Sequence, residues 1–397
     1  MTACPYCFAE LSTQKVAYRC TSGRCPEVID YEASSLAGFQ LLSTTPLILD
    51  ASSRHAFPTS VPCISCNSTC TQEVCIECLR DIPAGWREGE TLTLAVTGAV
   101  GVGKSVWIGV LVNQLQRLAA ARQVGFSAFN NSTKEIYEAN YQRPMYDSNG
   151  VLRPTPPLAD NEAYQREPLI WRFGGLAGGR DLFLVLRDMA GEDLERAHQA
   201  EPRFRYLGNA NLTLFLFDPF MVPGFLDLMA GRIEADSGRF GSPASEVLPY
   251  LLQQIEEGEC KLGLVISKFD AVQDLAGVNS PFAPIFANPA TMMRRDNTFT
   301  HPDASAPEVL LSRADYLSQS RLLELEIVSL LRALRESTIT AIANTAVREK
   351  RVRAVRHFAV SALGETPKHA DRLTVRGISP FRVLDPLLWE LSERGYF

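Results

Sequence analysis

The chain has 397 residues, which is long for one compact domain and suits one large domain preceded by a small module. Hydrophobic residues make up 46% and charged residues 21%, values that argue against wholesale disorder or a coiled coil. The net charge of −6 argues against a protein whose whole surface binds nucleic acid or anionic lipid.

The sequence predicts no membrane span. The most apolar run, residues 212–217, is followed at once by Asp218 and Pro219 and is too short to cross a bilayer. Residues 1–5 lack the basic and apolar regions of a secretory signal. We therefore expect a cytoplasmic protein.

Nine of the ten cysteines lie before residue 79, and Cys260 is the exception. Such clustering is typical of a local metal-binding module in a reducing compartment, and less so of a disulfide framework. We therefore expect a cysteine-rich zinc-binding module over residues 1–88 and a second domain over residues 89–397.

The spacing of the cysteines predicts two structural zinc sites, because each C-x-x-C turn directs two sulfurs at one tetrahedral ion. The expected quartets are Cys4, Cys7, Cys20 and Cys25, then Cys63, Cys66, Cys75 and Cys78. The pairing could instead interleave, with Cys4 and Cys7 joining Cys63 and Cys66. An iron–sulfur cluster and disulfides are weaker alternatives. Cys70 is left over and is expected to be a small buried thiol.

The charge of the module favours docking of a partner protein or a purely structural role. Residues 1–90 carry six Lys and Arg against ten Asp and Glu, and bound thiolates would add negative charge. Binding of nucleic acid is therefore not expected.

Short apolar runs alternate with helical patterns after residue 90. Strand-like runs at residues 169–173 and 181–187 flank a glycine-rich stretch and predict a hairpin. Further runs at 91–96, 212–217, 261–266 and 357–360 are separated by helical segments. This order predicts an α/β fold with a mainly parallel sheet that helices cover on both faces. Two proline-rich stretches, near 130–168 and 271–310, predict irregular inserted loops.

A phosphate-binding loop follows the first of these strands. Its pattern is G-x-x-x-x-G-K-[ST], in which glycines let backbone N–H groups surround a phosphate, the lysine reaches the β and γ phosphates and the hydroxyl binds Mg²⁺. The expected nucleotide-binding residues here are Gly98, Ala99, Val100, Gly101, Val102, Gly103, Lys104, Ser105 and Val106.

Three later motifs bear on which nucleotide is bound. A D-x-x-G motif supplies Asp188 for Mg²⁺ and the Gly191 N–H for the γ phosphate, with Glu192 next. An S-K-x-D motif follows another strand, with Asp270 suited to accept hydrogen bonds from guanine. The motif residues that would contact the base are Ser267, Lys268 and Asp270, then Ser361, Ala362 and Leu363.

In this order the motifs resemble those of the Ras-like, translation-factor-related class of P-loop GTPases, over roughly residues 90–397. With the cysteines in front, the chain resembles the bacterial double-GTPase families associated with multi-gene conflict systems. The resemblance implies a Ras-like fold that binds GTP, GDP and Mg²⁺. Ser267 departs from the usual Asn or Thr, and Glu192 stands where a Gln often orients water.

The threonine that would bind Mg²⁺ is less certain from sequence. Lys104 and Asp188 are 84 residues apart, which implies an insertion in the first switch. Thr155 is our first choice and Thr133 the second. We expect Lys104, Thr155, Asp188, Gly191 and Glu192 to carry the catalytic chemistry, with Arg153 as an ordinary surface residue.

The resulting hypothesis is a zinc-containing GTPase that acts as a molecular switch in a bacterial multi-protein system. Its partners would be an effector or an activating protein, which could be another GTPase. One alternative is an adaptor that binds GTP or GDP but hydrolyses little. The other is a P-loop ATPase in which the S-K-x-D match is a coincidence.

Overall fold

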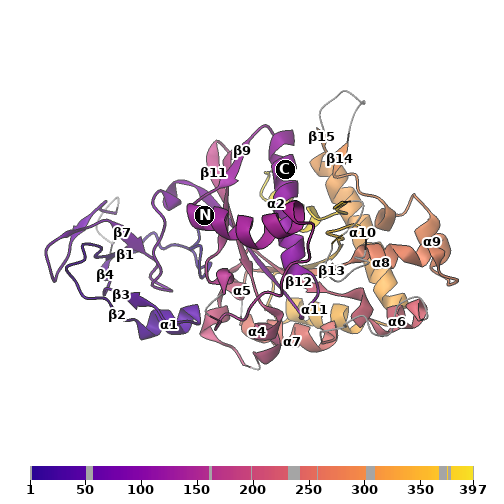
Figure 1. Ribbon diagram of the computed structural model, residues 1–397, viewed down its shortest axis with the longest axis horizontal. Helices are drawn as coiled ribbons and strands as arrows, with labels where there is room; N and C mark the ends of the chain where they lie inside the picture. Colours follow the sequence, from indigo (N-terminus) through magenta and orange to yellow (C-terminus); the bar gives the residue numbers. More distant parts are fainter. Residues whose placement is uncertain are drawn as a thin grey trace.

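A seven-stranded sheet forms the centre of the molecule (Figure 1). The computed structural model describes residues 2–50, 57–160, 163–197, 199–230, 242–256, 258–300, 309–365, 373 and 377–396. The strand order is β16-β13-β12-β8-β11-β10-β9. The bounds are β8 (Glu90–Gly98), β9 (Gly125–Ala128), β10 (Leu169–Ala177), β11 (Arg180–Asp188), β12 (Leu212–Phe217), β13 (Lys261–Ile266) and β16 (Ala354–Ala359).

The pairing of the strands confirms the predicted fold class. Neighbouring strands from β16 to β11 run parallel, whereas β10 pairs antiparallel with both β11 and β9. The predicted hairpin is thus the β10–β11 pair. Strands β12 and β13 are buried at every position, as expected for parallel strands covered on both faces.

Helices cover both faces of the sheet. Helix α2 lies on one face beside the C-terminal end of the chain, where Arg122 donates to the Tyr396 carbonyl, and α7 packs against α4 and α11 on the other (Figure 1). Helix α10 contacts β16 and α12. The helices of this domain are α2 (Lys104–Ala121), α3 (Asn131–Tyr137), α4 (Gly191–Arg196), α5 (Tyr206–Asn209), α6 (Pro223–Met229), α7 (Ala244–Gln254), α8 (Phe269–Gln273), α9 (Ala283–Ala287), α10 (Arg313–Ala333), α11 (Thr338–Arg348) and α12 (Asp385–Glu393). None of the described helices has the length and hydropathy that a membrane crossing requires.

The two inserted stretches are more ordered than the sequence predicts. The first contains α3, a π-helix η2 (Glu138–Asp147) and a 3₁₀ turn η3 (Tyr164–Arg166), so the expectation of irregular loops there is wrong. Asn130 caps α3 by accepting a hydrogen bond from the Thr133 N–H at 2.8 Å, which explains why the helix begins there. The second contains α9, short 3₁₀ turns and the strands β14 (Phe299–Thr300) and β15 (Val309–Leu310), while residues 301–308 lie outside the described residues.

The cysteine-rich part consists of two lobes. We call residues 2–11 and 75–89 the inner lobe, and residues 12–50 and 57–74 the outer lobe. The outer lobe contains β1 (Lys15–Arg19), β2 (Val28–Ile29), α1 (Tyr31–Ala37), β3 (Leu42–Ser43), β4 (Leu47–Asp50), β5 (Val61–Pro62), β6 (Thr69–Cys70) and β7 (Gln72–Val74). Strand β1 pairs antiparallel with both β4 and β7. The division into domains at residues 88 and 89 stays a prediction.

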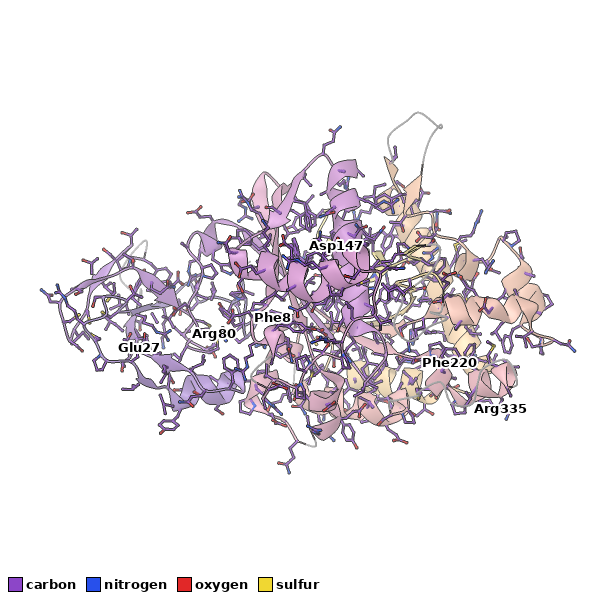
Figure 2. All side chains as sticks on the ribbon, viewed as in Figure 1. Phe8, Glu27, Arg80, Asp147, Phe220 and Arg335 are labelled. Atoms are coloured by element: carbon purple, nitrogen blue, oxygen red, sulfur yellow. The ribbon has the colours of Figure 1, made fainter. Side chains whose placement is uncertain are left out.

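The two lobes differ in what they pack against. Inner-lobe residues such as Phe8, Ile82 and Trp86 belong to the same buried core as the central sheet, whereas Val16, Tyr18 and Val61 form a separate small core in the outer lobe. Phe8 accordingly lies where the cysteine-rich part meets the sheet, and Glu27 lies out in the outer lobe (Figure 2).

Trp86 joins the inner lobe to the sheet. Its ring stacks on Phe183 of β11 at 4.7 Å between centroids and meets Phe129 edge-on at 5.4 Å. The indole N–H donates to the Ala3 carbonyl at 2.8 Å, so the polar end of the ring is also satisfied. The side chain is 1% exposed.

Replacing Trp86 should therefore destabilise the whole chain. We expect Trp86→Ala to lower the free energy of unfolding by about 3–5 kcal/mol, because it removes a fully buried aromatic ring and leaves a cavity. Tyr31→Ala is the matched control, since that ring is 80% exposed, and it should change stability by less than about 0.5 kcal/mol. Equilibrium denaturation of both variants measures this, and equal losses would contradict the packing described here.

Candidate functional site

The phosphate-binding loop connects β8 to the N-terminus of α2. Gly98, Gly101 and Gly103 have φ values of 140°, 75° and 88°, a region that favours glycine. A side chain at Gly98 would also lie 2.1 Å from the Leu216 carbonyl oxygen. No side chain caps the start of the 18-residue helix α2, so its first N–H groups face the loop.

Lys104 lies buried beneath this loop. Its ammonium donates to the carbonyls of Gly98 at 3.0 Å and Ala99 at 2.7 Å. Burial lowers the pKa of Lys104 to about 8, because the charged form loses its hydration while Asp188 and Glu195 only partly offset the loss. An anion bound in the loop would therefore stabilise the charged form of this lysine.

Ser105, Thr155 and Asp188 come together beside the loop. The Ser105 Oγ lies 2.5 Å from the Thr155 Oγ1, and the two hydroxyls donate to the Asp188 Oδ2 at 3.1 and 3.3 Å. Thr133, the second choice, lies elsewhere: it is fully buried, and its hydroxyl accepts from the Ile170 N–H at 3.0 Å. Arg153 is exposed.

This cluster has the donor set that Mg²⁺ prefers. Two hydroxyls and a carboxylate supply oxygen ligands, and the Asp188 Oδ1 is buried with no hydrogen-bond partner among the described residues. Burial also raises the pKa of Asp188 to about 6. A cation here would satisfy the orphaned oxygen and compensate for the buried negative charge, so the residues present fit a bound Mg²⁺.

Two tyrosines complete the cluster, and sequence reasoning missed both. The Tyr164 hydroxyl lies close to the hydroxyls of Thr155, Ser105 and Tyr141, and burial raises its pKa. The Tyr164 and Tyr141 rings meet edge-on at 5.8 Å. Tyr141 is carried by the π-helix η2, a distortion that is frequent at functional sites. No motif marks either residue, because both belong to the inserted stretch.

The D-x-x-G segment packs directly on the phosphate loop. A side chain at Gly191 would lie 2.5 Å from the Val100 nitrogen, so only glycine permits this approach. Glu192 is directed to solvent and pairs with Arg196 at 3.1 Å. Glu195 instead contacts the loop, accepting from the Val100 N–H at 3.2 Å. Sequence reasoning singled out Glu192 and overlooked Glu195, which lies one helical turn further along α4.

The two loops expected to contact the base lie side by side. The Ser361 Oγ donates to the Asp270 Oδ1 at 2.6 Å and accepts from the Gly364 N–H at 2.9 Å. Ala362 and Leu363 follow Ser361 in the same loop and pack against the core. The S-K-x-D loop is thereby fixed to the segment after β16.

Strand β12 positions the S-K-x-D loop from its other side. The Ser267 N–H and hydroxyl both donate to the Phe217 carbonyl at 2.9 Å. The Lys268 ammonium pairs with the Asp218 Oδ2 at 2.5 Å, while Lys268 itself has a left-handed backbone with φ of 48°. Asp218 was noticed in the sequence only as the end of an apolar run, and its contact with Lys268 was not foreseen.

Three cysteine turns in the cysteine-rich part share one geometry. The residue after the second cysteine has a positive φ in each, namely Phe8, Asn67 and Leu79. Its N–H donates to the carbonyl of the first cysteine at 2.9–3.1 Å. This hydrogen bond directs both sulfurs of a turn to the same side.

The quartets differ from the expected ones. One group is Cys4, Cys7, Cys75 and Cys78, and the other is Cys20, Cys25, Cys63 and Cys66. Both the consecutive pairing and the interleaved alternative are therefore wrong. The physical reason is β1, a strand of five residues that is roughly 17 Å long and lies between the first turn and Cys20. Its antiparallel pairing with β7 brings the last turn back to the first.

Both groups fit a zinc ion. The Sγ atoms of Cys4 and Cys78 lie 3.7 Å apart and those of Cys20 and Cys66 lie 3.6 Å apart. Four sulfurs about 2.3 Å from a tetrahedral zinc would be separated by about 3.8 Å. These distances are too long for disulfides, and all ten cysteines are unpaired as thiols. Cys70 is buried in the small core of the outer lobe and is outside both quartets.

The cluster of Ser105, Thr155 and Asp188 predicts that nucleotide binding depends on pH. A protonated Asp188 cannot serve as a ligand, so protons compete with the metal below its pKa of about 6. We expect Mg²⁺-dependent nucleotide affinity to stay level from pH 7 to 6.5 and then to fall by about tenfold per pH unit below 6. Asp188→Asn should bind more weakly with a flat profile, while Glu192→Gln should keep the wild-type profile. A level wild-type profile down to pH 5 would argue against this role.

The two cysteine groups should differ in what they stabilise. Cys7→Ser in the inner group and Cys25→Ser in the outer group should each reduce the zinc content from about two ions per chain to about one. Because the inner group shares the core of the sheet, Cys7→Ser should also lower the melting temperature of the sheet domain by at least about 5 °C. Elemental analysis and calorimetry on the same samples measure both effects, with Cys70→Ala retaining both ions as the control.

Comparison with known proteins gave one close relative. No family model matches the chain. The chain is 35% identical over 324 residues to a Mycolicibacterium smegmatis protein described as "Putative ESX-1 scaffolding and assembly protein SaeC", with 81% of this chain and 80% of the relative aligned. Among solved structures, the septin GTPase domain of Chlamydomonas reinhardtii matches with a TM-score of 0.28 and 12% identity, over 78% of this chain and 93% of that domain.

Proposed function

The chain belongs to the family of the mycobacterial SaeC protein, and we propose that it is a GTP-binding and GTP-hydrolysing switch in a bacterial multi-protein assembly. The description of this relative names scaffolding and assembly, and it does not name a conflict system. We therefore propose assembly as the process, in place of the defence role that the resemblance implied. The two zinc sites would serve stability or the docking of a partner.

One observation carries the proposal: Ser105, Thr155 and Asp188 converge beside a glycine-rich loop that also holds a buried lysine. A merely structural turn needs neither a buried lysine nor a buried carboxylate with an unpartnered oxygen, because each costs free energy in the empty site. A bound nucleotide with Mg²⁺ would compensate for both charges.

Each residue would have a distinct role in hydrolysis. The N–H groups of the loop and the Lys104 ammonium would hold the β and γ phosphates, and Ser105, Thr155 and Asp188 would hold Mg²⁺. When bound, Mg²⁺ would neutralise charge that develops on the phosphates. Gly191 lies against the loop, where its N–H is suited to the γ phosphate. Water would attack in line from the side opposite the leaving oxygen.

Replacing the Asp270 carboxylate by an amide should change the base preference from guanine to xanthine. Guanine presents two N–H donors to Asp270, whereas xanthine presents one donor and one carbonyl acceptor, which matches an amide. We expect Asp270→Asn to lower GDP affinity by at least about 100-fold and to gain affinity for xanthosine diphosphate. Titration with fluorescent GDP, ADP and xanthosine diphosphate measures this.

The matched control is Asp227→Asn, an exposed carboxylate on α6. It should bind GDP as the wild type does. Preference of the wild type for ADP would replace the GTPase by the P-loop ATPase. Lys104→Ala should bind neither nucleotide, and normal binding and hydrolysis by that variant would refute the site.

A second candidate is an adaptor that binds GTP or GDP but hydrolyses little. It is favoured by the position of Glu192, which pairs with Arg196 at the surface, and by the Glu195 carboxylate against the loop, which would repel a γ phosphate. Single-turnover hydrolysis separates the two candidates. A rate that rises only on addition of a second protein would support the switch with an external activator, which we propose could be another GTPase. The cytoplasmic location and the absence of nucleic-acid binding stay predictions.

A further inference from the structure

The helix α1 links the outer lobe to the sheet domain. It packs against the 3₁₀ turn η4 (Pro202–Phe204), and it ends at Gly38, which has a φ of 80°. A side chain at Gly38 would lie 2.7 Å from the Leu158 Cδ2 and 2.9 Å from the Arg203 Cδ. The backbone of the outer lobe is thus in direct contact with both of these residues.

The next residue, Phe39, strengthens this contact. The Arg166 guanidinium lies over its ring at 4.7 Å from the centroid. Arg166 also donates to the Leu158 carbonyl at 3.2 Å and to the Asp160 carbonyl at 2.8 Å. Phe39 is therefore held by the same segment that carries Thr155.

Asp193 joins this segment to the one that follows the D-x-x-G motif. Its Oδ2 accepts from the Leu158 N–H at 2.8 Å, and its Oδ1 lies 3.8 Å from the Arg203 Nη1. The carboxylate is 6% exposed, so these partners replace water. We call Leu158, Asp193 and Arg203 the Asp193 cluster. Within this cluster, Leu158 is three residues after Thr155, and Asp193 is two residues after Gly191.

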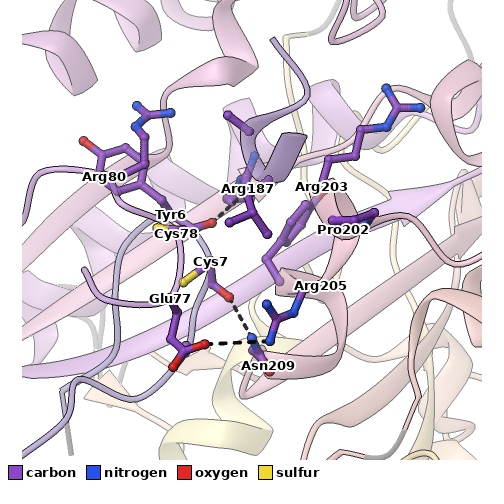
Figure 3. A pocket seen from close by; sticks show the side chains of 14 residues that line it. Tyr6, Cys7, Glu77, Cys78, Arg80, Arg187, Pro202, Arg203, Arg205 and Asn209 are labelled. Carbon is purple, nitrogen blue, oxygen red and sulfur yellow. Dashed lines mark hydrogen bonds and ion pairs between the residues drawn. The ribbon is translucent and has the colours of Figure 1, made fainter. Parts of the chain in front are cut away.

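The inner lobe is held differently. Arg187, on β11, donates to the Tyr6 carbonyl at 2.6 Å, and Asn209 donates to the Cys7 carbonyl at 3.0 Å (Figure 3). These contacts come from the sheet and from α5, which do not contact a nucleotide phosphate in the proposed site. The inner lobe is therefore fixed mainly to the sheet domain itself, with one further ion pair from Arg80 to Glu167 just before β10, whereas α1 rests on the segments proposed to respond to nucleotide.

There is open space on both sides of α1. A small cavity of about 30 Å³ is lined by Leu36 and Ala37 of α1 and, across from them, by Arg187 and Tyr206. A second hollow is lined by Gly38, Phe39 and Arg166.

We propose that the Asp193 cluster couples the nucleotide site to the outer lobe, so that the triphosphate state holds α1 against the sheet domain and the diphosphate state releases it. This proposal rests on the proposed function, because it requires GTP and Mg²⁺ to fix Thr155 and Gly191. With Thr155 and Gly191 fixed, Asp193 holds Leu158 and Arg203 in the positions that contact Gly38. Loss of the γ phosphate removes the interactions that favour this arrangement, which is the differential contact that any such coupling needs.

Hydrogen exchange on the full-length, zinc-loaded protein tests the proposal. The amides of residues 31–39 are compared with GDP and Mg²⁺ bound, and with a non-hydrolysable GTP analogue and Mg²⁺ bound. We expect exchange in residues 31–39 to be about tenfold slower with the analogue. Residues 188–196 should respond as well and serve as the internal report on the nucleotide site.

Two variants break the contact from opposite sides. Gly38→Ala inserts a methyl group against Leu158 and Arg203, and Leu158→Ala removes the side chain that Gly38 contacts while leaving α1 unchanged. Both should abolish the nucleotide dependence in residues 31–39 and retain it in residues 188–196. Gly23→Ala is the matched control, because Gly23 lies in the same lobe with a φ of 71° and has no neighbouring atom within 4 Å of the added methyl.

The outcomes separate this proposal from the proposed function. Equal exchange of residues 31–39 in the two states, with residues 188–196 still responding, would overturn the coupling and leave the switch intact. Absence of a response in both segments would overturn both. Because coupling is reciprocal, Leu158→Ala should also change the ratio of GTP-analogue to GDP affinity by the same factor of about ten.

Discussion

The alternation of side chains at the C-terminal end of β11 is the constraint on which much of the structure depends. Successive residues of a strand point to opposite faces, so Asp188 faces the phosphate loop while Arg187 faces the inner lobe. The parallel pairing of β11 with β8 places Asp188 beside Val96, two residues before Gly98. A shift of the register by one residue would exchange the two side chains and disrupt both contacts at once.

The same end of the sheet concentrates buried charge. Lys104 and Asp188 are both buried, and their pKa values move toward the neutral form, down to about 8 and up to about 6. Shifts in these directions mean that the environment disfavours both charges in the absence of other groups. Such a site is poised to bind a ligand that carries both signs of charge, as a nucleotide with a divalent cation does. The buried Tyr141 and the half-buried Tyr164 close it on the side of the inserted stretch.

The fold was predictable because its signals are local and periodic. The apolar runs and the β10–β11 hairpin depend on neighbouring residues, and the sheet confirms them. The sequence ranked Thr155 before Thr133 but could not fix the threonine, because the insertion lengthens the first switch. The cysteine quartets could not be deduced, because the pairing depends on how β1 and β7 meet and not on spacing. Tyr164, Asp218 and Asp193 carry no motif, and their contacts arise from segments far apart in the chain.

The two cysteine groups are nested along the chain. The first and last cysteine turns form the inner-lobe group, and the four cysteines of the outer-lobe group lie between them in the sequence. The outer-lobe group is complete once Cys66 has been synthesised, whereas Cys4 and Cys7 must wait for Cys75 and Cys78. If the outer-lobe group closes first, the chain between Cys7 and Cys75 is effectively shorter. The entropic cost of closing the inner-lobe group is then lower. The last turn is followed within twelve residues by β8, the strand that leads to the phosphate loop. Assembly of the cysteine-rich part during synthesis would therefore finish just as the first strand of the central sheet emerges.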